Sequence, residues 1–188
     1  MKIYYVTGNT NKLREAQKII PDLNGLTCEL TEIQSLDTFG IIKHKLDEAK
    51  KKFPDKNLIV EDTSLYFECL NNQLPGPYIK WFLKVLKPEG LAKLVNLHKN
   101  NRAFVKCVIG LSTDNKIEFF ESLVNGQIVE PKGTKEFGWD PIFIPNGYSK
   151  TYAEIGEEEK NKISHRSLVL EKVKKYLEAE SFKKEPIY

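Results

Sequence analysis

The chain has 188 residues, 40% of them hydrophobic and 29% charged, which excludes disorder over the whole length and leaves room for one ordinary domain. Its net charge of only +3 excludes a histone-like or polybasic nucleic-acid binder, so local clusters must hold any anionic ligand. We expect a single domain over residues 1–188, built as two lobes that share one core.

Three features of the sequence concern location and redox state. Polar residues interrupt every apolar stretch well before the ~20 residues that a membrane span needs. The N-terminus MKIYYVTGN lacks the apolar region of a secretion signal, so we expect a cytoplasmic, reducing location. Cys28, Cys69 and Cys107 are odd in number and widely spaced in apolar contexts. They predict buried, reduced thiols rather than a nucleophile or a zinc site.

The first third of the chain predicts a βαβαβ arrangement. Apolar runs and helical spacing give, in chain order, a strand at residues 2–6, a helix at 13–20, a strand at 26–33, a helix at 39–52 and a strand at 58–60. The third strand is expected to end at Glu61 and Asp62. This order predicts an α/β fold whose chemistry lies in the loops at strand ends.

The rest of the chain predicts an antiparallel second lobe. We expect two helices with Trp81, Phe82 and Val85 facing a core, then two long strands joined by a turn at 113–115. A loop, a short strand and a last helix follow; this helix begins at Ser164 and is buried through Val169, Val173 and Tyr176, and a frayed end completes the chain. The predicted bounds are 78–86 and 88–98 for the two helices and 102–112 and 116–124 for the two long strands. They are 133–140 for the loop, 142–144 for the short strand, 164–177 for the last helix and 181–188 for the frayed end.

A polar turn between the first strand and the first helix is the first candidate site. Its residues are Thr7, Gly8, Asn9, Thr10, Asn11 and Lys12. Backbone amides and a lysine ammonium can converge there on a phosphate at the positive end of the helix. The single glycine excludes a Walker loop and a dinucleotide fingerprint. A plain capped turn is the alternative.

Acidic residues at strand ends form the second candidate. Glu61 and Asp62 follow an apolar strand, one pointing inward and the other outward, and Glu32 lies at the end of the preceding predicted strand. Asp62 and Glu32 could share a magnesium ion that bridges phosphate oxygens. The alternative is that these acids only cap and solvate strand ends.

Aromatic and basic residues near the C-terminus form the third candidate. The loop Phe137-Gly138-Trp139-Asp140-Pro141 could stack a flat base and hydrogen-bond its edge, with core packing as the alternative. Lys160 and Ser164-His165-Arg166 surround the start of the last helix, where cations oppose the helix dipole, so a ligand explains them better. His165 and Arg166 are donors that would select a carbonyl oxygen over an amino group on a purine. In contrast, Lys172, Lys174 and Lys175 indicate a solvated helix face.

These segments together resemble the inosine triphosphate pyrophosphatase family over nearly the whole chain. The resemblance rests on five ordered motifs: TGNTNK, EDTSLYFECL, LPGPYIKWFL, FGWDPIFIPNGY and TYAEIGEEEKNKISHR. The PGPYIKWFL form is similar to the eukaryotic branch of that family.

The resemblance implies an activity and a fold. The activity is hydrolysis between the α and β phosphates of deaminated purine nucleotides (ITP, dITP, XTP), giving the monophosphate and pyrophosphate and removing these nucleotides from the pool. The implied metal is Mg²⁺, with Mn²⁺ as the alternative. The implied fold is α/β, with an elongated, mixed, twisted sheet, flanking helices and two lobes around a central substrate cleft. The implied assembly is a homodimer, with no nucleic-acid or membrane partner.

The resemblance also assigns roles to residues. Asp62 matches the metal-binding acid that is also the base for water, and Glu32 matches the second metal-binding acid. The phosphate loop matches at Thr7, Gly8, Asn9 and Lys12, inside the predicted substrate-binding turn 7–12. Further substrate positions are Lys45, Thr63, Lys80, Phe137, Gly138, Trp139, Asp140, Lys160, His165 and Arg166.

The chain departs from the family pattern in two loops. Residues 35–38 lack the acidic string that many members carry, and residues 71–73 (Asn-Asn-Gln) replace a shorter Gly-Gly pair. Asparagine tolerates the positive φ that such a loop needs.

Two other functions stay open: a broader nucleotide pyrophosphatase for pyrimidine or damaged triphosphates, and a nucleotide-sensing or RNA-binding module without turnover. The acids, lysines and His-Arg pair favour an enzyme, because a binder would not need the metal carboxylates.

Overall fold

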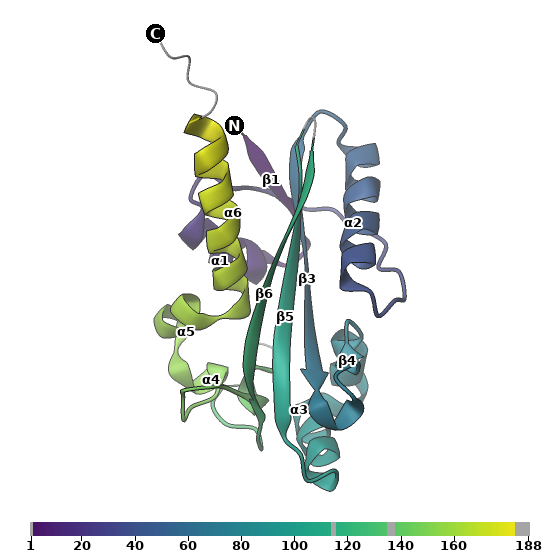
Figure 1. Ribbon diagram of the computed structural model, residues 1–188, viewed down its shortest axis with the longest axis vertical. Helices are drawn as coiled ribbons and strands as arrows, with labels where there is room; N and C mark the ends of the chain where they lie inside the picture. The colour runs from purple at the N-terminus through teal and green to yellow at the C-terminus, as the bar shows by residue number, and fades with distance from the viewer. Residues whose placement is uncertain (1, 114–115, 135–137, 183–188) are drawn as a thin grey trace. The chain divides into compact units, whose positions relative to one another are not determined.

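The computed structural model describes residues 2–113, 116–134 and 138–182, apart from the side chain of Phe182. It is a mixed α/β fold with one seven-stranded sheet (Figure 1). The strand order is β2-β1-β3-β5-β6-β7, and β4 pairs with β3. The strands are β1 (Ile3–Val6), β2 (Asn24–Leu26), β3 (Asn57–Phe67), β4 (Pro75–Gly76), β5 (Arg102–Ser112), β6 (Ile117–Ile128) and β7 (Phe143–Pro145). The predicted fold class, a mixed sheet flanked by helices, is confirmed.

Strand direction changes along the sheet. β1 runs parallel to both β2 and β3, with Tyr5 opposite Gly25 on one side and Ile59 on the other. β3 with β4 and β6 with β7 are antiparallel. Extending the register of β1 and β3 by two residues brings Thr7, the first residue of the polar turn, level with Glu61. The turn therefore begins beside the two acids of β3.

The chain divides into two compact units. Unit 1 contains Met1–Asp62, Val108–Ser122 and Arg166–Tyr188, and unit 2 contains Thr63–Cys107 and Leu123–His165. The strands β3, β5 and β6 contribute residues to both units.

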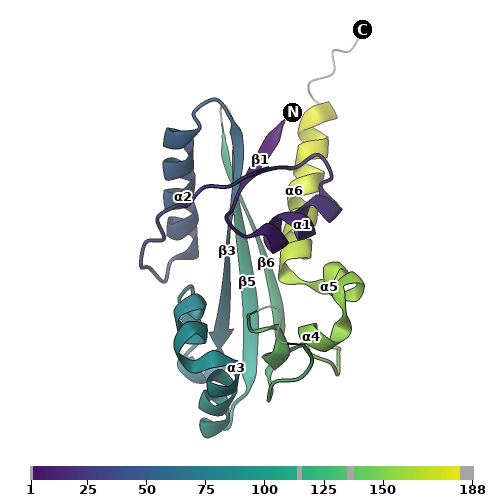
Figure 2. The same ribbon diagram turned by 180° about the vertical axis from the view of Figure 1, so that it is seen from behind.

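In unit 1, helices pack on both sides of the strands (Figures 1 and 2). α2 (Thr38–Lys52) is capped by Asp37, has three lysines in its last turn that suit the helix dipole, and buries Ile42 and Leu46 against Leu58 and Val60. α1 (Thr10–Ile19) and α6 (His165–Phe182) lie on the other side. The sheet of unit 1 is therefore covered on both faces.

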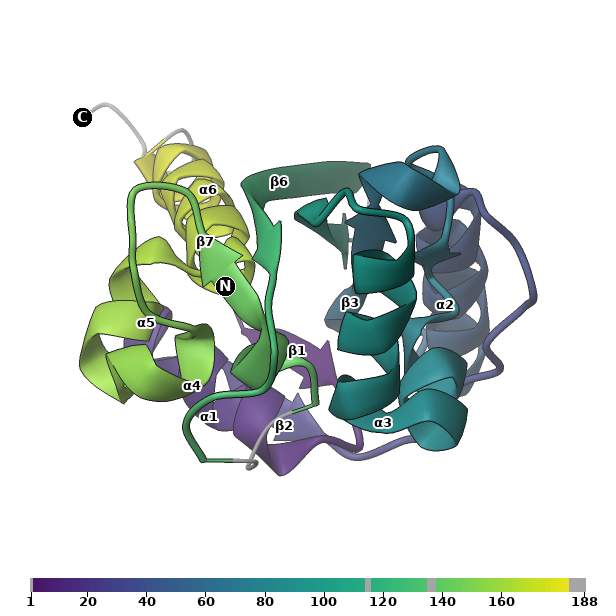
Figure 3. The same cartoon turned by 90° about the horizontal axis from the view of Figure 1, so that it is seen from below.

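Among the described residues, unit 2 has its own core, three α-helices and two short 3₁₀ helices, and Figure 3 labels the α-helices. The α-helices are α3 (Ile79–Leu97), α4 (Tyr152–Ile155) and α5 (Glu157–Ile163). The 3₁₀ helices are η1 (Glu68–Leu70), which follows β3, and η2 (Asp140–Ile142). α3 breaks at Lys87, where φ is 59° and ψ is 172°, just before Pro88. The two predicted helices are thus present as two segments of α3.

Several predicted side-chain positions and bounds are wrong. Trp81 is 52% exposed and Val85 76%, and only Phe82 of the predicted trio packs on the core. The strand predicted at 26–33 lies instead at Asn24–Leu26 and shares only Leu26 with the prediction, since its pairing with β1 runs from Tyr4 opposite Asn24 to Val6 opposite Leu26. β3 does not end at the acids but runs on to Phe67, since β4 gives it a further partner.

Other elements differ less from the prediction. β6 extends to Ile128, and α6 runs through residues 181 and 182, where fraying was expected. Residues 183–188, and 114–115 of the predicted turn, lie outside the described residues. All three cysteines are free, but only Cys107 is fully buried. Among the described residues, no helix combines the length and apolar character that crossing a membrane requires.

Candidate active site

The polar turn after β1 is a capped helix start. Asn9 Oδ1 accepts hydrogen bonds from the amides of Asn11 (3.0 Å) and Lys12 (3.2 Å), and Thr7 Oγ1 accepts one from the amide of Asn9 (3.1 Å). The amides of Gly8 and Thr10 make no hydrogen bond to any described residue. Space beside Gly8 is open, since a Cβ there would meet nothing within 4 Å. The turn is therefore capped and still keeps two amides at the positive end of α1 for an anion.

Glu61 and Asp62 face opposite sides of β3, because successive side chains of a strand alternate. The Glu61 side chain is 1% exposed and that of Asp62 is 15% exposed. The two carboxylates accordingly belong to separate charge clusters, both within unit 1.

Glu61 lies at the centre of a buried network. Arg166 donates to it from Nε (2.9 Å) and Nη2 (3.0 Å), Tyr5 donates its hydroxyl (2.7 Å), and Lys12 Nζ lies 3.0 Å away. Arg166 also pairs through Nη1 with Glu15. Burial alone would raise the pKa of Glu61, but the charges of Arg166 and Lys12 hold that pKa well below its ordinary value. The lysine of the polar turn is thus anchored by a buried carboxylate whose charged form the network stabilises.

On the other face, Asp62 shares one cation with Glu32. Lys45 Nζ lies 3.0 Å from Asp62 Oδ1 and 3.3 Å from Glu32 Oε1, and the Lys45 side chain is only 8% exposed. Burial would lower the pKa of Lys45, but the charges of Asp62 and Glu32 outweigh it and raise that pKa. Two carboxylates therefore already converge on a single positive charge.

This carboxylate pair fits a magnesium ion in its donor chemistry. Mg²⁺ is usually held by one or two carboxylates, with waters and substrate phosphates as the remaining ligands. In the part of the chain that the structure describes, no cluster of three or more His, Cys, Asp or Glu side chains could hold a metal. Waters and phosphate oxygens would complete the coordination of an ion held by Glu32 and Asp62.

Glu32 lies in an irregular segment that is attached to α2 by hydrogen bonds. Glu48 accepts a hydrogen bond from the amide of Thr31 (2.7 Å) and pairs with Lys52 (2.8 Å), which also donates to the carbonyl of Glu29 (2.8 Å). The hydrogen bonds from Lys52 and Thr31 lower the pKa of Glu48 to about 2. Sequence reasoning missed this role of Glu48, although an acid and a lysine four residues apart on a helix are a usual pairing signal.

In unit 2, the predicted base-recognition residues form an aromatic cluster. The Trp139 ring centroid lies 5.3 Å from that of His165 and 5.6 Å from that of Phe143, and Tyr152 packs on the same rings. Asp140 and Lys160 form a buried ion pair beside them. Trp139 is 7% exposed and belongs to the core of unit 2. Trp139 therefore takes part in core packing, while the buried ion pair is more than packing requires.

The remaining predicted positions are more scattered. Thr63 Oγ1 lies 3.6 Å from Cys107 Sγ, Lys80 is exposed with its ammonium 6.0 Å from the Trp81 ring, and Gly138 is exposed with φ of 49°. Phe137 lies outside the described residues. Unit 1 thus carries the turn 7–12 with Glu32, Lys45, Asp62 and Arg166, and unit 2 carries Thr63, Lys80, Gly138, Trp139, Asp140, Lys160 and His165.

Proteins of known structure share this sequence pattern and fold. The sequence model of the Ham1 family matches residues 3–176. The Ham1 protein of Staphylococcus aureus is 28% identical, with a TM-score of 0.80 over 95% of this chain and 100% of its own. A HAM1 protein from Coxiella burnetii is 25% identical, with a TM-score of 0.81 over 95% of this chain and 100% of its own.

A third solved structure shares the fold at lower identity. It is a nucleoside-triphosphatase, or dITP/XTP pyrophosphatase, from Mycobacterium abscessus, 23% identical, with a TM-score of 0.70 over 92% of this chain and 98% of its own. The match of the family sequence model over residues 3–176 shows that the chain belongs to the Ham1 family, the inosine triphosphate pyrophosphatase family that its motifs resemble.

Proposed function

We propose that this protein is a nucleoside triphosphate pyrophosphatase that hydrolyses the α-β phosphate bond of ITP, dITP and XTP to the monophosphate and pyrophosphate. The observation that carries the proposal is the convergence of Glu32 and Asp62 on one buried cation, Lys45. Membership of the Ham1 family and the dITP/XTP pyrophosphatase of M. abscessus support the same reaction.

Glu32 and Asp62 would hold Mg²⁺, or Mn²⁺ as the alternative, which supplies charge neutralisation to the phosphate oxygens. Lys45, already between these acids, and Lys12, anchored by Glu61, place two further positive charges in unit 1. Because the protein holds both ammonium groups in place before substrate arrives, they stabilise developing charge without reorganising.

Asp62 is the proposed general base. A water attacks the α-phosphorus, the bond from that phosphorus to the bridging oxygen breaks, and its electrons leave with pyrophosphate. Asp62 takes the proton that the water loses, a contribution that is typically ~100- to 10,000-fold. Glu61 cannot take this role, because its lone pairs face Arg166, Tyr5 and Lys12.

Selection for deaminated bases follows from hydrogen-bond donors. Hypoxanthine and xanthine carry a 6-oxo acceptor, which donors from His165, Arg166 and backbone amides would satisfy. Adenine would turn an amino group toward the same donors, and a buried mismatch of this kind costs about 1–3 kcal/mol. Glu61 and Glu15 hold the Arg166 guanidinium rigidly, so it would meet the base without losing side-chain freedom.

We also propose that the enzyme works in the cytoplasm as a homodimer. The dimer rests on the family resemblance alone. Light scattering on the purified protein at several concentrations measures it directly.

A nucleotide panel assayed with and without Mg²⁺, with both products quantified, tests the proposed function. Pyrophosphate and monophosphate from ITP and XTP, formed only with the metal, would support it. Orthophosphate would show that another bond is cut, and a preference for pyrimidine triphosphates would favour the broader pyrophosphatase. Binding without any product would favour the nucleotide-sensing module.

A further inference from the structure

Tyr152, the first residue of α4, carries a buried hydroxyl that nothing in the described structure satisfies. The residue is 2% exposed, and its hydroxyl makes no hydrogen bond to any described residue. A buried polar group without a partner carries a desolvation penalty, so each such group in a native protein calls for an explanation. A phenylalanine would fill the same space without that penalty.

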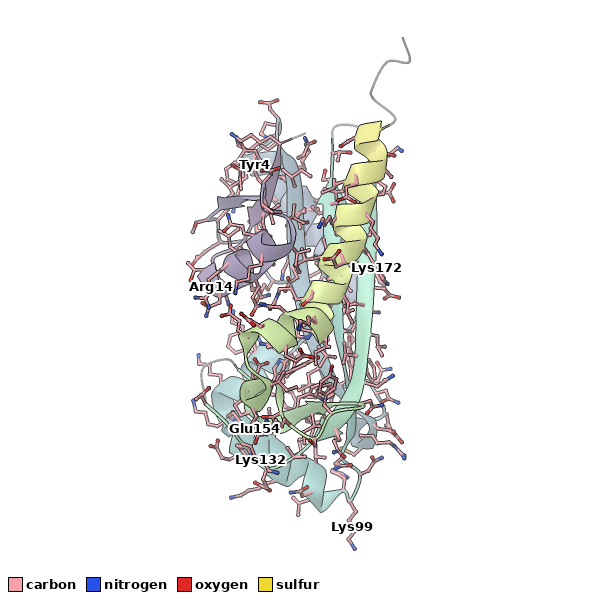
Figure 4. The ribbon with its side chains drawn as sticks, turned by 90° about the vertical axis from the view of Figure 1, so that its left-hand side faces the viewer. Tyr4, Arg14, Lys99, Lys132, Glu154 and Lys172 are labelled. Carbon is pink, nitrogen blue, oxygen red and sulfur yellow. The ribbon has the colours of Figure 1, made fainter. Side chains whose placement is uncertain are left out.

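The helix start around Tyr152 gives no structural reason for the hydroxyl. The amide of Thr151 donates to Glu154 Oε2 (2.9 Å), and the Thr151 hydroxyl donates to the carbonyl of Lys132 (3.2 Å). Figure 4 labels Glu154 and Lys132 in this part of unit 2. The cap of α4 is therefore complete without Tyr152.

The Tyr152 ring packs among the predicted base-recognition residues. Its centroid lies 5.3 Å from that of Phe143 and 6.2 Å from those of Trp139 and His165, and Lys160 Nζ lies 5.8 Å from it. Burial first, and then the negative charge of Asp140, raise the pKa of Tyr152. The hydroxyl therefore stays protonated and can donate a hydrogen bond at any physiological pH.

We propose that the Tyr152 hydroxyl is a specificity-determining donor to the 6-oxo group of the purine base. The inference rests on the proposed function, and it explains why a tyrosine is kept where a phenylalanine would be the more stable choice. The 6-oxo oxygen of the substrate would accept the hydrogen bond for which the described residues provide no acceptor.

The test compares Tyr152→Phe with the unchanged enzyme on two substrates, ITP and purine riboside triphosphate, which lacks the 6-oxo group. We expect kcat/KM for ITP to fall about 3- to 10-fold, the range for one neutral hydrogen bond, with no change for purine riboside triphosphate. The melting temperature without nucleotide should stay the same or rise. Tyr148→Phe is the matched control, since Tyr148 is exposed and its hydroxyl bonds Glu159 (3.4 Å); it should leave the ratio of the two substrates unchanged.

Two results would overturn the inference. An unchanged ratio of the two substrates in Tyr152→Phe would remove the hydroxyl from base recognition. A lower melting temperature, or a failure to fold, would show that the hydroxyl has a structural partner instead. If the unchanged enzyme forms no pyrophosphate from ITP, the proposed function fails before the variant is examined, so the two failures are distinguishable.

Discussion

Glu61→Gln should destabilise the protein strongly, because it removes one charge from a buried network. The glutamine has nearly the same shape but turns an amide donor toward Arg166, Tyr5 and Lys12, which all need an acceptor. Removing one partner of a buried ion pair typically costs 3–5 kcal/mol, and we expect about 3 kcal/mol here. We take the lower end of this range for two reasons. Arg166 still has Glu15 as a partner in the variant, and the Lys12 side chain, which is 23% exposed, can be solvated by water.

The chain contains a matched control for this change. Glu68 also pairs with an arginine through both carboxylate oxygens, but the side chains of Glu68 and Arg102 are 38% and 71% exposed. Exposed ion pairs contribute little, since water screens them and ordering two side chains costs entropy. Glu68→Gln should therefore leave the free energy of unfolding close to that of the unchanged protein.

Urea unfolding followed by circular dichroism measures both variants. With a slope of about 2 kcal/mol per molar urea, Glu61→Gln should lower the midpoint by about 1.5 M, and it should lower the melting temperature by about 6–12 °C. Equal midpoints for the two variants would refute the reasoning, because burial would then not decide what these ion pairs contribute.

Three further predictions address the site and its supports. Asp62→Asn should abolish most turnover at saturating Mg²⁺ while the protein stays folded; near-normal turnover would show that Asp62 is not the base. Gly8→Ala should leave the melting temperature unchanged, since its Cβ meets nothing within 4 Å. It should raise KM for ITP, because the added methyl group approaches the phosphates; an unchanged KM would show that the phosphates do not bind at this turn. The pKa of Glu48, about 2 in the folded protein, lies below its unfolded value, so its contribution to stability is present above pH ~4.3 and disappears as the pH falls through the folded pKa. Carbon-13 NMR of the Glu48 carboxyl group should show this titration, and Lys52→Met should raise the pKa of Glu48. A pKa near 4.3 in the unchanged protein would contradict the hydrogen bonds described.

Elements with strong local patterns could be predicted from the sequence. The helix 39–52 and the strand 102–112 agree with α2 and β5 to within one residue, because periodicity and end signals point the same way. Asn71 and Asn72 have φ of 57° and 56°, which confirms that asparagine takes up the positive φ expected in this loop. These features depend on residues close together in the chain.

Features that depend on distant partners could not be predicted. Apolar residues after Leu26 predicted a strand over 26–33, but the strand that pairs with β1 lies before them, with its register ending at Val6 opposite Leu26. The exposure of Trp81 and Val85 is likewise decided by which side of α3 meets the core, and spacing alone does not show that.

The candidate site shows the same division between local and distant information. The turn 7–12 was recognisable because its residues are contiguous, and the alternation of Glu61 and Asp62 follows from strand geometry. The partners of these acids were not recognisable. Arg166 is 105 residues from Glu61 in sequence, and a sequence read alone assigns such an arginine to a ligand because its buried counter-charge is invisible.

Arg166 consequently calls for a different experiment from simple truncation. An alanine there would leave Glu61 buried with only Lys12 and Tyr5 as partners, so lost activity would report misfolding as readily as lost base recognition. Comparing the ratio of ITP to ATP turnover, rather than either rate, separates the two effects, since a folding defect lowers both rates together. The two neighbouring acids of β3 need the same separation of structural and catalytic effects. Glu61 is buried and holds cations in place inside unit 1, whereas Asp62, on the opposite face, keeps part of its surface open to solvent and is the acid of the pair that we propose as the base.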